Sequence, residues 1–271
     1  MVNVRKPAVA GSFYPDRPEL LQVEVARLLN EATGDNIRPK ALIVPHAGYM
    51  YSGHVAACAF RLLSSIHINR VILFGPSHRV ALEGCAVPSC EYFETPLGMI
   101  KLDQLACDSL LKKNLVNLND AAHQFEHSLE VQLPFLQFCL DEFSIIPIVV
   151  GYQDESKIKD IIKCLDISET DLILISTDLS HFHHYDEAAE LDSASINKVL
   201  SLSASLVSNE ACGSHAVNGF LQYMRAKKLS STNCLEKPDM DWRICLLKYA
   251  NSGDVIANKQ EIVGYASFAV Y

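Results

Sequence analysis

Four short apolar runs constrain the fold of this chain more than any other feature of its sequence. They are ALIV (41–44), VILF (71–74), IIPIVV (145–150) and LILIS (172–176). Their apolar residues do not alternate with polar ones, and strands of this kind are usually covered on both faces. Patterns typical of helices lie between them. The sequence therefore predicts an α/β fold of three layers, helix–sheet–helix, around a largely buried sheet.

Helical patterns cover much of the remaining chain. The first begins near Asp16 and Pro18, because proline fits the first turn of a helix. Within another, Pro134 predicts a kink or a boundary. The helices expected after the first cover residues 53–66, 102–113, 126–140, 155–165, 185–202 and 215–228.

The C-terminal part of the chain has a different pattern. RICLLKYA (243–250) and EIVGYASFAVY (261–271) are both strand-like, and a polar loop separates them. This arrangement is typical of an antiparallel pair, so the central sheet is expected to be mixed. No repeat or linker divides the sequence, and residues 1–271 are therefore expected to form a single domain.

Charge and composition exclude some classes of function. The formal net charge is −9 and no basic run exceeds two residues, which argues against nucleic acid as a partner. No apolar stretch approaches the roughly 18 residues of a membrane span, and the N-terminus lacks the apolar core of a secretory signal. The nine cysteines form no CxxC pair and are expected to be reduced. We therefore expect a cytoplasmic protein that does not enter membranes.

Three histidines follow the ends of three predicted strands. His46 comes just after ALIV, His78 just after VILF, and His181 just after LILIS. Adjacent strands lie about 4.8 Å apart, and ligands of open α/β sheets gather beyond the carboxyl ends of the strands. We therefore expect the three side chains to share a site. Histidine is the commonest metal ligand and the commonest general base, and two histidines with one anionic group can hold a metal.

Three residues are candidates for the anionic group. Cys212 is predicted to open the helix that follows it, where the helix dipole would lower its pKa and favour the thiolate; it could equally be one more buried cysteine. Asp178 could orient a metal-site histidine or cap a turn. Glu130 would share a helix face with His127, either as a metal-binding pair or as a buried pair that braces the site.

Three further residues lie beside these motifs. Tyr49 comes shortly after His46 and would either line a cleft or pack in the core. Arg79 follows His78 and would either contact an anionic ligand or lie at the surface. His215, at the end of the segment ACGSH, is expected to line or support the cleft.

The sequence closely resembles the Memo family. The motifs that carry the resemblance occur in the family's order along nearly the whole chain. They are VRKPAVAGSFYP (4–15), PHAGYMYSG (45–53), GPSH (75–78), EHSLEVQLPFL (126–136), STDLSH (176–181), ACGSH (211–215) and VGYAS (263–267). That family is similar in fold to the LigB-like class III extradiol dioxygenases, which are non-haem iron enzymes. The resemblance therefore implies a LigB-like three-layer domain with a mixed sheet.

The resemblance also implies roles for individual residues. His46 and His78 match the two family histidines at the metal position, and Cys212 matches the cysteine that completes that set. His181 matches the histidine that acts as catalytic acid or base in LigB-like enzymes, and Asp178 matches a nearby acidic residue. The dioxygenases have a carboxylate where this chain has cysteine, so ring cleavage is not expected. The cofactor implied is one transition metal ion, with iron or copper favoured over zinc.

Three functions are compatible with these residues. The leading hypothesis is a metal-dependent redox enzyme that acts on a small molecule, with His181, tuned by Asp178, moving protons. The second is a non-catalytic module that binds a peptide or a protein in the same cleft. The third is a zinc-dependent hydrolase with Glu130 or His181 as general base. Microbial members of the family are often grouped with an AMMECR-type domain protein and a radical-SAM protein, so the resemblance implies these two as partners.

Overall fold

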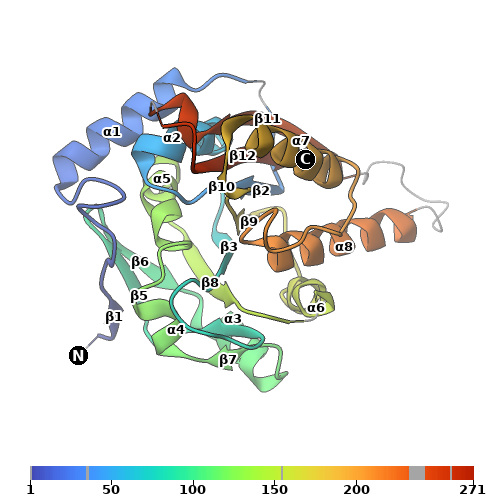
Figure 1. The fold of residues 1–271 in the computed structure, drawn as a ribbon. Coiled ribbons are helices and arrows are strands. Elements are labelled where there is room, and N and C mark those ends of the chain that lie inside the picture. The colour runs from blue at the N-terminus through green and yellow to red at the C-terminus, as the bar shows by residue number, and fades with distance from the viewer. Residues whose placement is uncertain (1, 35–36, 154, 232–241, 257) are drawn as a thin grey trace.

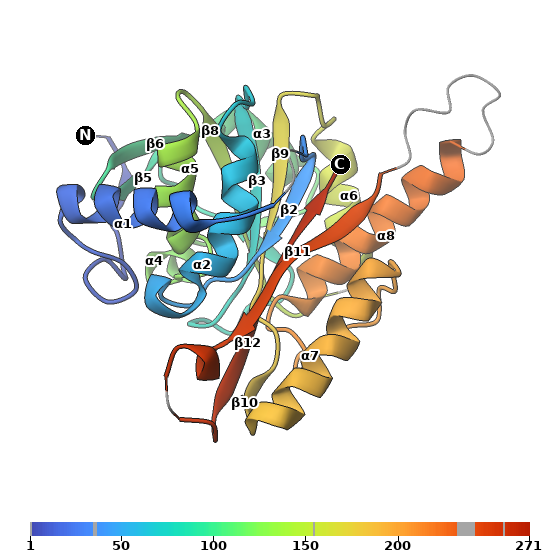
Figure 2. The ribbon, with the colours of Figure 1, turned by 90° about the horizontal axis from the view of Figure 1, so that it is seen from above.

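Helices cover both faces of one mixed sheet, as the sequence predicts (Figure 1). The computed structural model describes residues 2–34, 37–153, 155–231, 242–256 and 258–271. Figure 2 shows the sheet edge-on between two groups of helices. The described α-helices are α1 (Pro18–Glu31), α2 (Tyr49–Phe60), α3 (Gln104–Lys112), α4 (Asp120–Gln124), α5 (Leu133–Cys139), α6 (Ser156–Cys164), α7 (Tyr185–Leu200) and α8 (Ser214–Ser231).

The described strands form a single twelve-stranded sheet. Neighbouring strands follow the order β1-β5-β6-β8-β3-β9-β2-β12-β10, with β11 beside β12, and β4 between β7 and β8. Their bounds are β1 (Val4–Arg5), β2 (Ala41–Val44), β3 (Arg70–Pro76), β4 (Cys85–Val87), β5 (Tyr92–Thr95), β6 (Gly98–Leu102), β7 (Asn117–Leu118), β8 (Ser144–Val150), β9 (Asp171–Ser176), β10 (His181–His183), β11 (Ile244–Asn251) and β12 (Ile262–Val270).

The centre of the sheet is parallel and its C-terminal part is antiparallel. The strands β8, β3, β9 and β2 run parallel to one another, whereas β12 pairs antiparallel with β2 and with β11. The four apolar runs are these four parallel strands, and the two C-terminal runs are β11 and β12. The predicted mixed sheet is therefore confirmed, and the carboxyl ends of β2, β3 and β9 lie along one edge.

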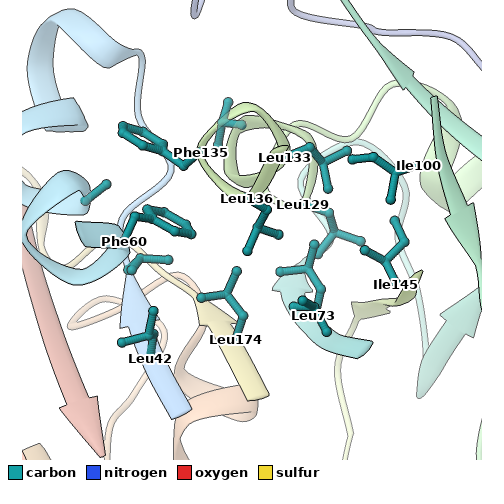
Figure 3. Close-up of a cluster of buried hydrophobic side chains, with 14 of the residues drawn as sticks. Leu42, Phe60, Leu73, Ile100, Leu129, Leu133, Phe135, Leu136, Ile145 and Leu174 are labelled. Carbon is teal, nitrogen blue, oxygen red and sulfur yellow. The ribbon is translucent and has the colours of Figure 1, made fainter. Parts of the chain in front are cut away.

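The apolar runs are unbroken because each strand packs against helices on both faces. In β2, Leu42 and Val44 belong to the core beneath α1, α2 and α5, whereas Ala41 and Ile43 belong to the core beneath α3, α6, α7 and α8. Figure 3 shows the first of these cores, where Phe60 stacks on Phe135 above the sheet. Burial on both faces removes the alternation that a half-exposed strand would show.

The prediction of a helix over residues 126–140 is wrong for the first half of this range. Residues 126–129 lie outside any helix, residues 130–132 form a 3-10 turn, and α5 begins only at Leu133. The carboxylate of Glu126 accepts hydrogen bonds from the backbone N–H groups of His127 and Ser128, at 2.9 Å each. A side chain that binds its own neighbouring N–H groups competes with helix formation, so α5 starts where Pro134 fits the first turn.

Other boundaries differ less. Helix α2 begins at Tyr49, four residues earlier than expected, and ends at Phe60, where a 3-10 turn continues to Leu63. The eight described cysteines are all free thiols, while Cys234 lies outside the described residues. Within the described ranges, no helix is both long enough and apolar enough to cross a membrane.

Candidate metal centre

The parallel strands carry His46 and His78 to the same edge of the sheet. His46 lies two residues past the end of β2 and His78 lies two residues past the end of β3, with β9 between these strands. The ring centroids of the two histidines are 5.1 Å apart. Of the three histidines expected to share a site, these two therefore lie together, whereas His181 is not one of the three residues whose ligand atoms converge.

Cys212 joins the two histidines from the loop before α8. Its Sγ lies 3.3 Å from His46 Nε2, and one ligand atom from each of His46, His78 and Cys212 lies within 4.8 Å of the others. His46 is only 1% exposed, whereas the His78 side chain is 28% exposed. Solvent and small ligands therefore reach the cluster from the side of His78.

A glycine next to Cys212 permits this close approach. The Gly213 N–H donates to Thr177 Oγ1 at 2.8 Å, which joins the loop to the end of β9. A Cβ atom at position 213 would lie 2.7 Å from Thr177 Cβ and 2.8 Å from the Ser176 carbonyl oxygen. Any larger residue would push this loop, and with it the Cys212 thiol, away from the strand.

A hydrogen-bond chain fixes the tautomer of His46. The Ser176 hydroxyl donates to the Ser128 carbonyl at 2.6 Å, so it must accept from His46 Nδ1, 2.8 Å away. Nδ1 therefore carries the proton, and the lone pair of Nε2 faces Cys212. Burial is the largest cause that holds the pKa of His46 well below its usual range, and repulsion from His78 and His127 lowers this pKa further. A neutral imidazole with a fixed lone pair is the form that binds metals.

Glu126 orients His78 in the same way, and sequence reasoning missed this residue. Its Oε1 lies 2.9 Å from His78 Nδ1, and its Oε2 accepts the His78 backbone N–H at 2.5 Å. Burial alone would raise the pKa of Glu126, but the hydrogen bond and attraction from His78, with help from the Ser128 N–H, lower the pKa to about 2. The ionised carboxylate leaves His78 Nε2 as the free ligand atom.

Cys212 differs from its expected chemistry in one respect. It lies before α8 rather than within the first turn, since that helix begins at Ser214. Burial and the nearby Asp178 carboxylate raise the pKa of the Cys212 thiol to about 12. Hydrogen bonds to the sulfur, including one from the Asp178 N–H, lower this pKa by a smaller amount. The prediction that the helix start lowers this pKa is therefore wrong. A bound cation would reverse the balance, because a coordinating thiol is deprotonated outright.

The donor set fits a transition metal. His46 Nε2, His78 Nε2 and Cys212 Sγ are two imidazole nitrogens and one sulfur, a set that suits copper, zinc or iron and leaves coordination positions open. Both Nδ1 atoms are held by neighbours, Ser176 and Glu126, as is usual for metal-binding histidines.

His127 belongs to the same cluster, but it does not pair with Glu130. Its ring stacks against His78, with centroids 4.6 Å apart, and lies 5.5 Å from that of His46. His78, Glu126 and His127 form a second group of potential metal ligands. Because Glu126 already accepts three backbone N–H groups and orients His78, this second group serves as support for the first.

Glu130 is a structural residue rather than a site residue. It is fully buried and forms an ion pair with Arg5. Tyr14 donates its hydroxyl at 2.6 Å, and the N–H groups of Ala8 and Val9 donate at 2.8 and 3.0 Å. The buried structural alternative is therefore the correct one, although the partner is Arg5 and not His127. Metal binding and general-base roles for Glu130 are excluded by these contacts.

Asp178 and His181 flank the cluster. Asp178 is buried, accepts the His46 N–H at 2.7 Å, and lies 3.8 Å from His46 Nε2. Burial raises its pKa to about 7. His181 is half-buried at the start of β10, close enough for its charge to lower the pKa of His46, and its own pKa is lowered mainly by burial. His181 is therefore available as a neutral base beside the cluster.

The remaining candidates have three different environments. Tyr49 is buried, donates to the Val131 carbonyl at 2.8 Å, and packs as a core residue. Arg79 is exposed next to the cluster. His215 is half-buried in the first turn of α8, where its ring meets Tyr152 at 5.5 Å.

A buried histidine outside the cluster makes stability depend on pH. His123 is 2% exposed; burial lowers its pKa to about 4, although its hydrogen bond to the Ala86 carbonyl opposes the shift. A histidine with a lowered native pKa stabilises the fold above its unfolded pKa of about 6.5 and loses that contribution as pH falls towards 4. When the pH falls from 7.5 to 5.0, the contribution of His123 to the free energy of unfolding, measured in urea, should fall by about 2 kcal/mol.

The control for this pH effect is an exposed histidine. The His123→Gln variant should lose less stability over the same pH interval than the wild type, whereas His67→Gln, altered at an exposed residue, should match the wild type. If the free energy of unfolding changed equally with pH in the wild type and in His123→Gln, the assignment of this pH effect to His123 would be contradicted.

The fold and the cluster define an α/β protein with a candidate metal centre of two histidines and one cysteine. The profile of the family described as "Memo-like protein" matches residues 5–269. A MEMO1 family protein of Methanosarcina mazei is 36% identical, covering 99% of this chain and 100% of its own, and one of Aquifex aeolicus is 34% identical, covering 97% and 98%. This chain belongs to the Memo family.

Solved structures are also similar to this chain. One of them is the uncharacterized protein JW3007 of Escherichia coli K12, which matches 86% of this chain and 100% of its own length. The TM-score is 0.49 and the sequence identity is 11%.

Proposed function

We propose that this chain is a metal-dependent redox enzyme that acts on a small molecule. His46, His78 and Cys212 would hold one ion, with iron or copper favoured over zinc. The observation that carries the proposal is the convergence of their three ligand atoms within 4.8 Å. The hydrogen bonds of Ser176 and Glu126, which turn both histidine Nε2 atoms into free acceptors, support it.

Two residues of the protein would transfer the proton and position a metal ligand. When bound, the metal ion supplies electron transfer and polarises a ligand beside it. His181, neutral near pH 7 because burial lowers its pKa, accepts or returns a proton at a ring nitrogen. Asp178 holds the backbone of His46 in place through its N–H.

The experiment combines metal loading with a search for turnover. Protein reconstituted anaerobically with Fe(II), Cu(I) or Zn(II) is mixed with fractionated small-molecule extract, and dioxygen uptake and substrate loss are followed. We expect turnover with iron or copper but not with zinc. His181→Gln should keep its metal and lose about 100-fold or more of the rate.

Two results would contradict the redox proposal. Zinc-dependent turnover without dioxygen would indicate a hydrolase, for which His181 is the remaining base. Tight peptide binding that survives His181→Gln, together with no turnover of any fraction, would indicate a binding module.

Glu126 gives a second, independent prediction. Glu126→Gln keeps the size of the side chain but removes the charge that holds His78 Nδ1. Loss of such a partner typically weakens metal binding about 10- to 100-fold. Competition with a chromophoric chelator measures the affinity, and Glu94→Gln, at a partly exposed residue paired with Lys6, is the matched control. Unchanged affinity in Glu126→Gln would show that His78 needs no orienting carboxylate.

A further inference from the structure

A buried carboxylate outside the candidate metal centre binds the residue that precedes His181. Asp192 lies in α7, which runs alongside β10 and β12 (Figure 2), and it is 0% exposed. Its Oδ1 accepts the Ser180 backbone N–H at 3.0 Å, and its Oδ2 accepts the Tyr249 hydroxyl at 2.8 Å. A carboxyl group is costly to bury unless neighbours donate hydrogen bonds to it. These two donors therefore allow Asp192 to lie in the interior.

A glycine of β12 allows the carboxylate to reach this segment. A Cβ atom at position 264 would lie 1.9 Å from Asp192 Oδ2, so any larger residue would push the carboxylate away from Ser180. Gly264 also donates its N–H to the Ser180 carbonyl at 3.0 Å and accepts the Leu179 N–H at 2.8 Å. Asp192 and Gly264 together hold the backbone of residues 179 and 180. This contact explains the glycine in the VGYAS motif, which has no part in the candidate metal centre.

The strand that begins at His181 contains a β-bulge. Between His181 and His183, β10 has one residue more than β12, so Phe182 is the extra residue. Phe182 has a φ of 63°, a left-handed conformation that a bulky residue rarely adopts. Bulges redirect side chains and are common next to active sites. Such a conformation persists only where the surrounding structure holds it, and the hydrogen bonds to Asp192 and Gly264 lie directly before the bulge.

The same segment also contacts the ring of His181. A hydrogen bond with the Leu179 backbone raises the pKa of His181, against the larger lowering by burial. A hydrogen bond that raises the pKa of a histidine is one that the ring donates. It keeps a proton on one ring nitrogen and leaves the other nitrogen free to accept. Movement of Leu179 and Ser180 would therefore change both the direction of the ring and its tautomer.

We propose that Asp192 is a positioning residue for His181. By holding the backbone of residues 179 and 180, it keeps the His181 ring in one direction and one tautomer beside the candidate metal centre. The inference rests on the proposed role of His181 as a base. It concerns the state of a single ring, however, so it can be tested without a metal ion and without a substrate.

NMR spectra of the full chain, labelled with ¹⁵N in its histidines and kept in EDTA, test the proposal. The His181 signals are identified by their absence in His181→Gln. We expect a single tautomer and a titration midpoint below about 6.5 in the wild type. Asp192→Ala should give a mixture of tautomers and a midpoint closer to 6.5, because a looser ring is less buried. Asp192→Asn, which keeps an oxygen for the Ser180 N–H, should restore the single tautomer.

A second buried residue of α7 provides the matched control. Val199 is 2% exposed in the apolar core, so Val199→Ala should unfold at a lower urea concentration and leave the His181 signals unchanged. If Asp192→Ala does not fold, Tyr249→Phe takes its place. It removes one donor to Asp192 and should shift the His181 signals in the same direction by a smaller amount.

Two results would overturn the positioning role. One is a wild-type His181 spectrum in Asp192→Ala or, where that variant does not fold, in Tyr249→Phe. The other is an equal disturbance of His181 by Val199→Ala, which would show that any loss of stability moves the ring. The redox proposal fails separately: a disturbed His181 in Asp192→Ala, with no turnover by the metal-loaded wild type, would contradict the redox function and leave the positioning role intact.

Discussion

Replacement of Glu130 by alanine should cause the largest loss of stability that we predict for a single substitution. The Arg5 and Glu130 side chains are 6% and 0% exposed, so the variant would leave the Arg5 guanidinium buried without its counter-charge. Removing one partner of a buried ion pair costs about 3–5 kcal/mol. The Tyr14 hydroxyl and two backbone N–H groups would lose their acceptor as well.

Urea unfolding at pH 7 measures this loss. A domain is typically stable by about 5–15 kcal/mol, so the variant would lose a large share of its stability. Glu94→Ala is the control, because the Glu94 carboxylate pairs with the exposed Lys6 and should contribute about 1 kcal/mol or less. A Glu130→Ala variant that unfolds at the same urea concentration as Glu94→Ala would show that Arg5 and its neighbours do not depend on this carboxylate.

Loss of the Cys212 thiol should have the largest effect on metal binding. Cys212→Ser replaces the only sulfur of the cluster with a hydroxyl that stays protonated and binds soft metals poorly. Since removal of residues that merely orient a ligand costs about 10- to 100-fold, removal of the ligand itself should cost more than about 100-fold in affinity. His46→Ala should lose a comparable amount.

Chelator competition under anaerobic conditions measures these affinities. Cys164→Ser is the matched control, because this free cysteine ends α6 and does not belong to the cluster. Equal affinities for Cys212→Ser and Cys164→Ser would exclude Cys212 as a ligand.

The strands and their ends could be predicted from sequence because they depend on local patterns. A run such as LILIS, apolar on both faces, is recognisable without knowledge of its neighbours. Once the strands are parallel, the residues after them must meet at one edge, and so His46 and His78 could be placed together. Cys212 could be assigned only through the family resemblance, since its position depends on how the loop before α8 folds back against Thr177.

The loop from residue 126 to 129 shows why part of the site could not be predicted. Its sequence has a helical pattern, and on a helix Glu130 would lie beside His127. In the structure the Glu126 carboxylate binds local N–H groups and His78, while Arg5, near the N-terminus of the sequence, binds Glu130. Contacts between residues far apart in the sequence decide the roles of these two glutamates, and no local pattern encodes them.

X-ray absorption spectroscopy of metal-loaded protein tests the proposed metal centre most directly. Spectra at the iron or copper edge, for wild type and Cys212→Ser, report the atoms bound to the metal. We expect one sulfur neighbour, at about 2.3 Å if the bond resembles a zinc–thiolate bond, together with two imidazoles, and we expect the sulfur signal to vanish in the variant. A spectrum without sulfur in the wild type, or one unchanged in Cys212→Ser, would contradict the assignment of His46, His78 and Cys212 as the metal ligands.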